Sequence, residues 1–362
     1  MKKNRLIVGL VVLVALGLLV VWGWHRIHFD FAEFRAQVAM ANWWKILIAL
    51  GCIYVGYVLR SIRWALLLRH NRAVPVLSLV GTQVMGFTAV ALIGRVADLV
   101  RPYLVARKTG MEISSQIAVY IVERLFDAGS MALIVSIALL QVPESEVMNA
   151  INHSGHLASL NQSAPWLAPF VFRYGGLVLT LLGALFLVGI RVGGEVIARI
   201  FQGIFGVVSK RLGEAVGHKI RTFRMGLDTI RSFGDFAATS SLSLVMWALI
   251  AAAYLETMRA FTASPQLANV SVGKCVLLMV VSGGASIVQL PIIGWFSQIG
   301  IVMLAISGIL GAGHEAATAC AAMLLLVTFL GIVPVGLIWA QVENVSLRKV
   351  AKESEVSEAS GL

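Results

Sequence analysis

The chain has 362 residues, of which 59% are hydrophobic and only 13% are charged. A soluble domain carries roughly 25% charged residues, so the composition excludes an ordinary soluble protein and predicts a membrane protein with several crossings. The formal net charge is +11, but no nucleic-acid-binding module is visible, and we assign the excess Lys and Arg to contact with anionic lipid headgroups.

Apolar runs of about 20 residues, the length that crosses a bilayer, recur along the chain. The first, Leu6–Trp24, ends at Trp22 and Trp24, which are typical interfacial anchors, so we interpret it as a retained helix rather than a signal peptide. We therefore expect an all-α polytopic membrane protein with about six spanning helices. The other five are predicted at residues 43–68, 115–140, 166–190, 236–258 and 315–340.

The distribution of basic residues predicts the orientation. Basic residues precede the first helix, follow the last helix and fill segment 191–233, whereas residues 141–165 contain no Lys or Arg. Because basic residues mark the cytoplasmic side, we expect a multi-pass protein of the bacterial or archaeal cytoplasmic (inner) membrane with both termini in the cytoplasm. Segment 191–233 favours an interfacial amphipathic helix over a partner-binding coil. Residues 1–341 then form one transmembrane domain, and residues 342–362 form a disordered tail.

Two further apolar regions, residues 76–108 and 271–312, are interrupted by glycine, polar or charged residues. With this orientation, the first must enter and leave on the cytoplasmic side and the second on the outer side. They are predicted to be re-entrant hairpins of opposite orientation within an inverted repeat, with repeat one at about 43–140 and repeat two at about 236–340. Many transporters build a midplane site this way. Plain full crossings are the alternative.

A charged stretch, Gly94–Gly110, and a second motif, Val122–Asp127, interrupt this apolar chain. Ionisable groups at membrane depth are costly, so each needs a partner, a water-filled cavity or a function. We therefore take them as candidate site residues. The ionisable residues concerned are Arg95, Asp98, Arg101, Glu123, Arg124 and Asp127.

The spacing of these residues predicts how they pair. Asp98 and Arg101 lie three apart and share a helical face, which Arg95 extends. Glu123 and Asp127 lie four apart and would repel each other, so we expect arginines of the first motif to face the acids of the second. Such a network is either a structural link between two elements or a site where arginine forks bind phosphate and an acid carries protons.

The two motifs resemble the flippase-like transmembrane domain of the lysylphosphatidylglycerol synthase family. Its members show a G-R-x-G-E-x-x-R block and then an E-R-x-x-D block. Ala97 stands where a glycine is usual and Asp98 where a glutamate is usual. The resemblance covers roughly residues 40–340. The matching positions are Gly94, Arg95, Arg101, Glu123, Arg124 and Asp127.

The second half resembles the family's P-G-G-x-G-x-x-E block more loosely. Pro291 and Gly294 are present, but Gln298 stands in place of the acid, so any proton coupling through that acid is in doubt here. In the family's synthases a soluble transferase domain follows the membrane domain, whereas only residues 341–362 follow here. We therefore expect the stand-alone membrane part, without lysyl-transferase activity.

Two functions are consistent with these features. The first is a lipid flippase or transporter that moves a polar or anionic phospho- or glycolipid and has no enzymatic activity. The alternative is an accessory membrane protein, or a lipid-headgroup-modifying enzyme, that works with a lipid synthase or glycosyltransferase. We expect no cofactor and no metal, because the H-x-x-H pair His153 and His156 lacks the three or four ligands that a metal site needs.

Overall fold

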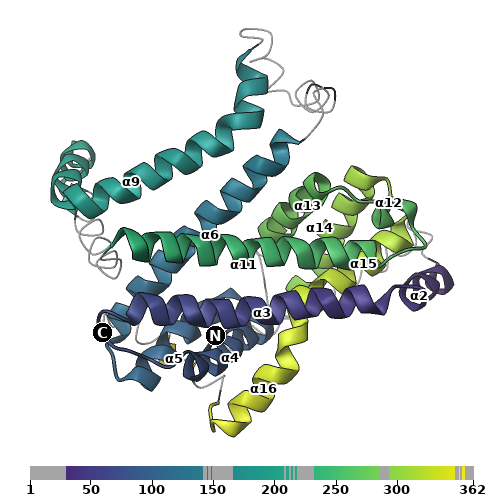
Figure 1. Cartoon of the computed structure of the whole chain (residues 1–362), viewed down its shortest axis with the longest axis horizontal. Helices are drawn as coiled ribbons and strands as arrows, with labels where there is room; N and C mark the ends of the chain where they lie inside the picture. Colours follow the sequence, from purple (N-terminus) through teal and green to yellow (C-terminus); the bar gives the residue numbers. More distant parts are fainter. Residues whose placement is uncertain are drawn as a thin grey trace, which may run out of the picture.

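The computed structural model describes residues 30–141, 166–207, 232–285 and 293–346, together with isolated residues between and beyond these ranges. The predicted first helix, Leu6–Trp24, lies outside them. Every described element is helical (Figure 1). The elements are α2 (Phe31–Ala39), α3 (Trp43–Leu68), α4 (Val76–Ile93), η1 (Arg95–Leu99), α5 (Val100–Thr109), α6 (Ile113–Leu140), α9 (Leu167–Gly206), α11 (Phe233–Arg259), α12 (Pro265–Ala268), α13 (Val272–Ala285), α14 (Ile293–Leu310), α15 (His314–Thr328), η3 (Leu330–Ile332) and α16 (Val333–Val342).

The long helices follow the predicted apolar runs closely. By length and composition, α3, α4 and α11 can each cross a membrane, and the bent pair of α15 and α16 makes a fourth candidate span. Helix α6 lies outside this set because Glu123, Arg124 and Asp127 all fall in its middle. The described residues therefore contain three to four candidate spans, and the total of six stays a prediction.

Helices α3 and α11 lie side by side and antiparallel along the bundle (Figure 1). At one end, the Asp235 carboxylate at the start of α11 contacts both Arg69 and His70 at the end of α3. At the other end, the backbone N–H of Asn42, which caps α3, donates to the carbonyl of Ala260 at 2.8 Å. The two helices are thus connected at both ends and form the frame against which the other elements pack.

A first helical hairpin packs beside this frame. Helix α4 ends at Gly94, whose φ of 95° favours glycine, and η1 and α5 then run back against α4. Arg72, just after α3, donates to the carbonyl of Thr109 at the end of α5, so both ends of the hairpin lie near the C-terminal end of α3. Helix α5 has 10 residues, about 15 Å of length, which is half of a hydrocarbon core of about 30 Å.

A second helical hairpin, α13 and α14, enters from the opposite end of the frame. Its start lies beside the C-terminal end of α11, because Arg259 Nη2 donates to the carbonyl of Val270 at 3.1 Å. Its end leads into α15, where Glu315 accepts a 3.4 Å hydrogen bond from the backbone N–H of Asp30, just before α2. The two hairpins therefore point in opposite directions along the bundle.

The hairpins meet inside the molecule. The indole N–H of Trp295, near the start of α14, donates to the carbonyl of Ala91, near the end of α4, at 3.2 Å. Residues 286–292, which connect α13 to α14, lie outside the described residues. This contact brings together two segments that are 204 positions apart in the sequence.

The predicted last helix, residues 315–340, is broken. Helix α15 and the segment formed by η3 and α16 are bent by 42° relative to each other. Pro334 lies in the first turn of α16, where its missing N–H removes a helical hydrogen bond across the break. The carbonyl of Gly331, freed by the break, accepts a hydrogen bond from Tyr54 Oη at 2.9 Å, as buried backbone requires within a membrane.

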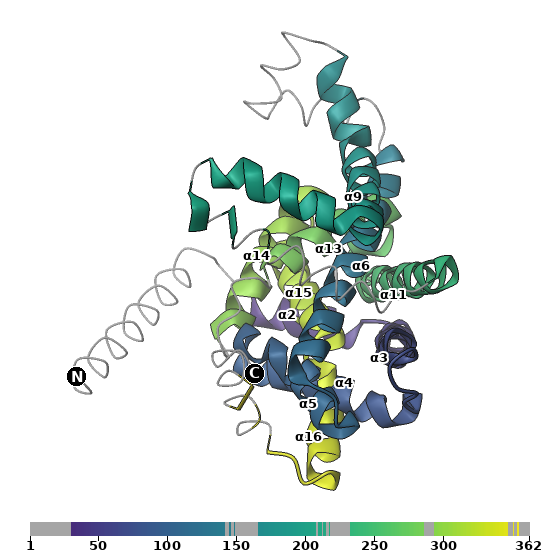
Figure 2. The same cartoon turned by 90° about the vertical axis from the view of Figure 1, so that its left-hand side faces the viewer.

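The predicted span 166–190 and the start of the basic segment 191–233 form one helix, α9, with non-helical backbone at Gly193. Helix α9 packs against α6 at the edge of the bundle (Figure 2). Beyond α9 the basic segment lies mostly outside the described residues. Its interfacial position therefore stays a prediction.

Described residues of the predicted tail contact the first hairpin. Lys108 of α5 forms an ion pair with Glu343 at 2.7 Å, and Tyr103 Oη donates to Glu353 at 2.8 Å. Val350 is buried in an apolar cluster with residues of α4 and α5. This part of the tail therefore packs near the end of α5.

Candidate functional site

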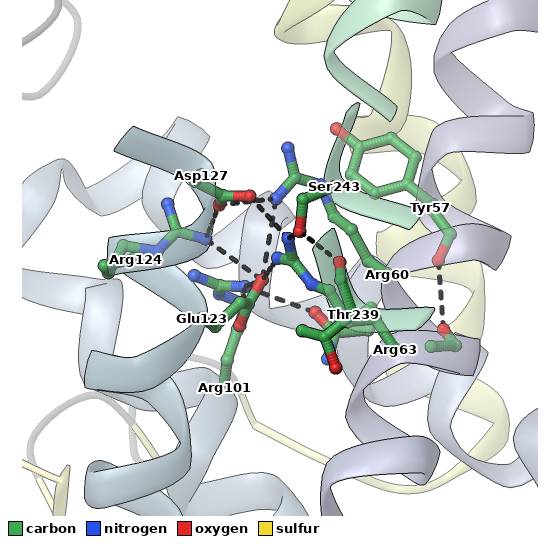
Figure 3. Close-up of polar contacts among 11 residues, drawn as sticks. Tyr57, Arg60, Arg63, Arg101, Glu123, Arg124, Asp127, Thr239 and Ser243 are labelled. Carbon is green, nitrogen blue, oxygen red and sulfur yellow. Dashed lines mark hydrogen bonds and ion pairs between the residues drawn. The ribbon is translucent and has the colours of Figure 1, made fainter. Parts of the chain in front are cut away.

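Four arginines and two carboxylates form a largely buried network, which we call the charged cluster. Figure 3 shows the guanidinium groups converging on two acids of α6. Two of the arginines come from α3, one from α5 and one from α6. The members are Arg60, Arg63, Arg101, Glu123, Arg124 and Asp127.

Arg63 makes the shortest contacts in the cluster. Its Nη2 lies 2.6 Å from Glu123 Oε1, and its Nη1 lies 2.6 Å from Asp127 Oδ1. The same Nη1 donates to Ser243 Oγ of α11 at 2.6 Å. The side chain of Arg63 is fully buried. These charge-assisted hydrogen bonds join α3, α6 and α11, so Arg63 has a structural role.

The contact of Arg101 with Glu123 confirms the expected pairing between the motif at Gly94–Gly110 and the motif at Val122–Asp127. Its Nη1 lies 3.4 Å from Glu123 Oε1 and 3.3 Å from Gln83 Oε1. Two of its nitrogens, Nε and Nη2, have no hydrogen-bond partner among the described residues. The guanidinium carbon instead lies 4.4 Å from the ring centre of Phe87 and 5.0 Å from that of Tyr120, where cation–π attraction replaces part of the lost solvation.

The hairpin leaves no room for a larger residue at Gly86 of α4, because a Cβ there would overlap the side chain of Arg101. We expect Gly86→Ala to push Arg101 away from α4 and to destabilise the protein by about 1–3 kcal/mol, as overpacking does. Thermal unfolding in detergent measures this loss of stability. Gly51→Ala is the matched control, since a Cβ at Gly51 meets nothing within 4 Å. Equal melting temperatures for the two variants would contradict the close packing of α4 on α5.

All four arginines contact Glu123, at distances of 2.6–3.6 Å from its Oε1. Three of them also contact Asp127, at 2.6–3.5 Å. The two carboxylates lie one helical turn apart and would repel each other without these cations. Since a buried charge is stable only when paired, the arginines and acids depend on each other, and the cluster holds α3, α5 and α6 together.

Arg60 and Arg124 differ from the other two arginines because they also line a cavity of about 210 Å³. Their side chains are 11% and 36% exposed, whereas those of Arg63 and Arg101 are fully buried. Arg60 makes only long contacts with the acids, at 3.5 and 3.6 Å. Arg60 can therefore face a ligand without breaking the short bonds of the cluster. Arg124 contacts both acids through Nη2, at 3.0 and 3.1 Å, and its Nε has no partner among the described residues.

The charge around this end of the cavity is positive. Asp98 of η1, the third carboxylate here, also lines the cavity and lies close enough to Arg124 for their charges to interact. Even with Asp98 included, four arginines face three carboxylates. The excess charge points to an anionic ligand.

The cavity extends from the charged cluster to the second hairpin. It follows α3 from Arg60 to Ile53 and the antiparallel α11 from Met246 to Tyr254, about two helical turns or 10–12 Å. Gln298 of α14 contributes to its far wall and is 6% exposed. The two halves of the chain thus share one cavity.

Six of the nine predicted site residues lie in the charged cluster or line the cavity. Arg101, Glu123, Arg124 and Asp127 belong to the charged cluster, and Asp98 and Gln298 line the cavity. Gly294 is buried in α14. Pro291 and the side chain of Arg95 lie outside the described residues.

Arg60 and Arg63 are not among the predicted site residues, because both lie towards the C-terminal end of the predicted helix 43–68. Charges near helix ends usually extend towards the interface, so these arginines gave no clear signal of a site. Their three-residue spacing puts both on one face of α3, and Arg63 lies more than one turn before Leu68. This spacing could have indicated that they face the acids of α6.

The described residues contain no group of three or more His, Cys, Asp or Glu that could hold a metal ion. His153 and His156, the H-x-x-H pair, lie outside the described ranges. The three cysteines are all free and lie within or against the apolar core.

A helical bundle with three to four candidate spans and a buried charged cluster defines a multi-pass membrane protein. The chain belongs to the lysylphosphatidylglycerol synthase transmembrane-region family, whose profile matches residues 6–336. No curated protein and no solved structure matches it. Family membership indicates a membrane protein that is linked to lipid or envelope synthesis.

Proposed function

We propose that this protein is a lipid flippase, without enzymatic activity of its own, that moves a polar or anionic phospho- or glycolipid across the cytoplasmic membrane. The main support for this proposal is the shared cavity, which has arginines at one end and the second hairpin at the other. A headgroup passes through this cavity while its acyl chains stay in the surrounding lipid.

The arrangement of the hairpins supports two-sided access. Both are re-entrant in this proposal, the first from the cytoplasm and the second from outside, with both termini in the cytoplasm. Helix α5 is about half as long as a bilayer core is thick, and the contact between Trp295 and Ala91 joins the two hairpins. Opposed broken helices that meet at the midplane are a common design in transporters.

The arginines support an anionic substrate. Arg60 and Arg124 present planar donor groups that match two phosphate oxygens at once and cannot lose their charge. Wall residues such as Phe87, Met131 and Ile250 are apolar, which strengthens electrostatic attraction by lowering the local dielectric constant. A monoanionic phosphodiester would neutralise the excess positive charge.

We expect the purified protein to move lipid between the leaflets of liposomes. The full chain in liposomes should make a fluorescent phosphatidylglycerol on the inner leaflet accessible to a membrane-impermeant quencher added outside. We expect an initial rate at least about tenfold above that of protein-free liposomes, because uncatalysed passage requires a charged headgroup to cross the hydrocarbon core. Equal rates in the two preparations would contradict flippase activity.

An accessory function is the second candidate, because the family is named for a synthase. In that case a lipid synthase or glycosyltransferase is the partner, and the protein supports synthesis rather than movement. Lipid analysis of both leaflets in a deletion strain separates the two functions. Loss of a lipid species would favour the accessory function, whereas an unchanged amount in the wrong leaflet would favour transport.

A further inference from the structure

The end of the cavity away from the arginines is lined by neutral polar groups. Tyr254 Oη donates to Ser282 Oγ at 2.8 Å, and Gln298 Nε2 donates to the same oxygen at 3.4 Å. Gln298 Oε1 is buried and has no hydrogen-bond partner among the described residues. The indole N–H of Trp247, which lines the same cavity nearer the arginines, is likewise buried without a described partner.

Buried polar groups are nearly always hydrogen-bonded, so two unpartnered ones in a cavity wall indicate a ligand with matching groups. At the far end Gln298 Oε1 needs a donor, and nearer the arginines the Trp247 N–H needs an acceptor. A hydroxyl group both donates and accepts hydrogen bonds. The far end of the cavity is therefore suited to a hydroxylated headgroup.

The second hairpin offers no counter-ion for a charged headgroup. From Cys275 to Leu310 the sequence contains no Asp, Glu, Lys, Arg or His, and this includes the undescribed residues 286–292. Asp98 is the one carboxylate among the described residues that line the cavity, and it lies at the arginine end beside Arg124. An ammonium group at the far end would therefore be buried without a counter-ion, which is costly.

We infer that the lipid carried by this protein has a phosphodiester, bound by the arginines, followed by an uncharged hydroxylated headgroup such as glycerol or a sugar. A headgroup that bears an ammonium group is disfavoured. This inference rests on the proposed function and specifies its substrate class.

Binding of short-chain lipids to the full chain in neutral detergent tests the inference, with thermal stabilisation as the readout. The matched pair is phosphatidylglycerol and phosphatidylmethanol, because both are phosphodiesters with the same charge and only the first has headgroup hydroxyls. We expect phosphatidylglycerol to bind about tenfold more tightly, the effect of one or two hydrogen bonds. Phosphatidylethanolamine should bind more weakly than both.

The variant Gln298→Leu should reduce the preference for phosphatidylglycerol over phosphatidylmethanol to within about twofold. Gln37→Leu is the control, since Gln37 is also buried with an unpartnered Oε1 but lies on α2, outside the cavity lining. Ser282→Ala is a second variant with the same expected loss of preference, and it removes only one oxygen atom.

The outcomes separate this inference from the proposed function. If phosphatidylglycerol and phosphatidylmethanol bind the wild type equally, or if Gln298→Leu keeps the preference, the headgroup inference is wrong while lipid movement can still be observed. Glycerol phosphate without acyl chains is the soluble comparison. Stabilisation by glycerol phosphate equal to that by the lipid would overturn the assignment of a lipid ligand.

Discussion

Glu123→Gln is expected to destabilise the protein by about 3–5 kcal/mol, the cost of removing one partner from a buried ion pair. All four arginines of the charged cluster lie within 3.6 Å of Glu123 Oε1. Loss of this charge leaves Asp127 and the more distant Asp98 to compensate four cations in a site with little water. The expected result is a large fall in melting temperature, or failure to recover folded protein from detergent.

Thermal unfolding of the purified full chain measures this effect. Glu33→Gln is the matched control, because it makes the same chemical change at an exposed position of α2. Arg63→Met combined with Glu123→Gln should recover part of the lost stability, since the double change removes a cation together with its partner. A Glu123→Gln variant as stable as Glu33→Gln would show that the described contacts do not stabilise the bundle.

Replacing both Arg60 and Arg124 by glutamine is expected to weaken binding of anionic lipid strongly while the protein stays folded. These two arginines line the cavity, and Arg60 contributes only long contacts to the acids. Arg124 contacts them at 3.0 and 3.1 Å, so we expect the variant to lose some stability as well. In the variant, Arg63 still pairs with both Glu123 and Asp127, and Arg101 still pairs with Glu123. Phosphate contacts from arginine are charge-assisted, so we expect affinity for phosphatidylglycerol to fall by about a hundredfold.

Stabilisation by short-chain phosphatidylglycerol, measured for wild type and variant, gives the affinities. Arg107→Gln is the control, because Arg107 is an exposed arginine of α5. The melting temperature without lipid shows whether the fold is kept. Unchanged lipid affinity in a folded double variant would place the anionic headgroup elsewhere.

Much of the helical architecture can be predicted because apolar length determines which segments cross a membrane. Residues 43–68 form a helix with the predicted bounds, and residues 76–108 form a helical hairpin, since tryptophans, proline or glycine mark where these segments begin or turn. The break in residues 315–340 was missed because the apolar run continues through it. Pro334 was the available signal for that break.

The candidate site was predicted only in part. The arginine–acid pairing between motifs follows from charge alone, and Arg101 and Glu123 confirm it. The contribution of α3 could not be predicted, because a charge near a helix end is usually solvated at the interface. The sharing of one cavity by Arg124 and Gln298 depends on long-range packing of two hairpins, which no local pattern in the sequence encodes.

We propose that the arginines lining the cavity bind an anionic lipid headgroup as it moves between the leaflets. The most direct test is the rate of phosphatidylglycerol movement in liposomes containing equal amounts of folded wild type, Arg60→Gln/Arg124→Gln or Arg107→Gln. Wild type and Arg107→Gln are expected to move the lipid at similar rates, and the double variant is expected to fall to the rate of protein-free liposomes. A double variant that moves the lipid as fast as wild type would contradict a role of these arginines in transport.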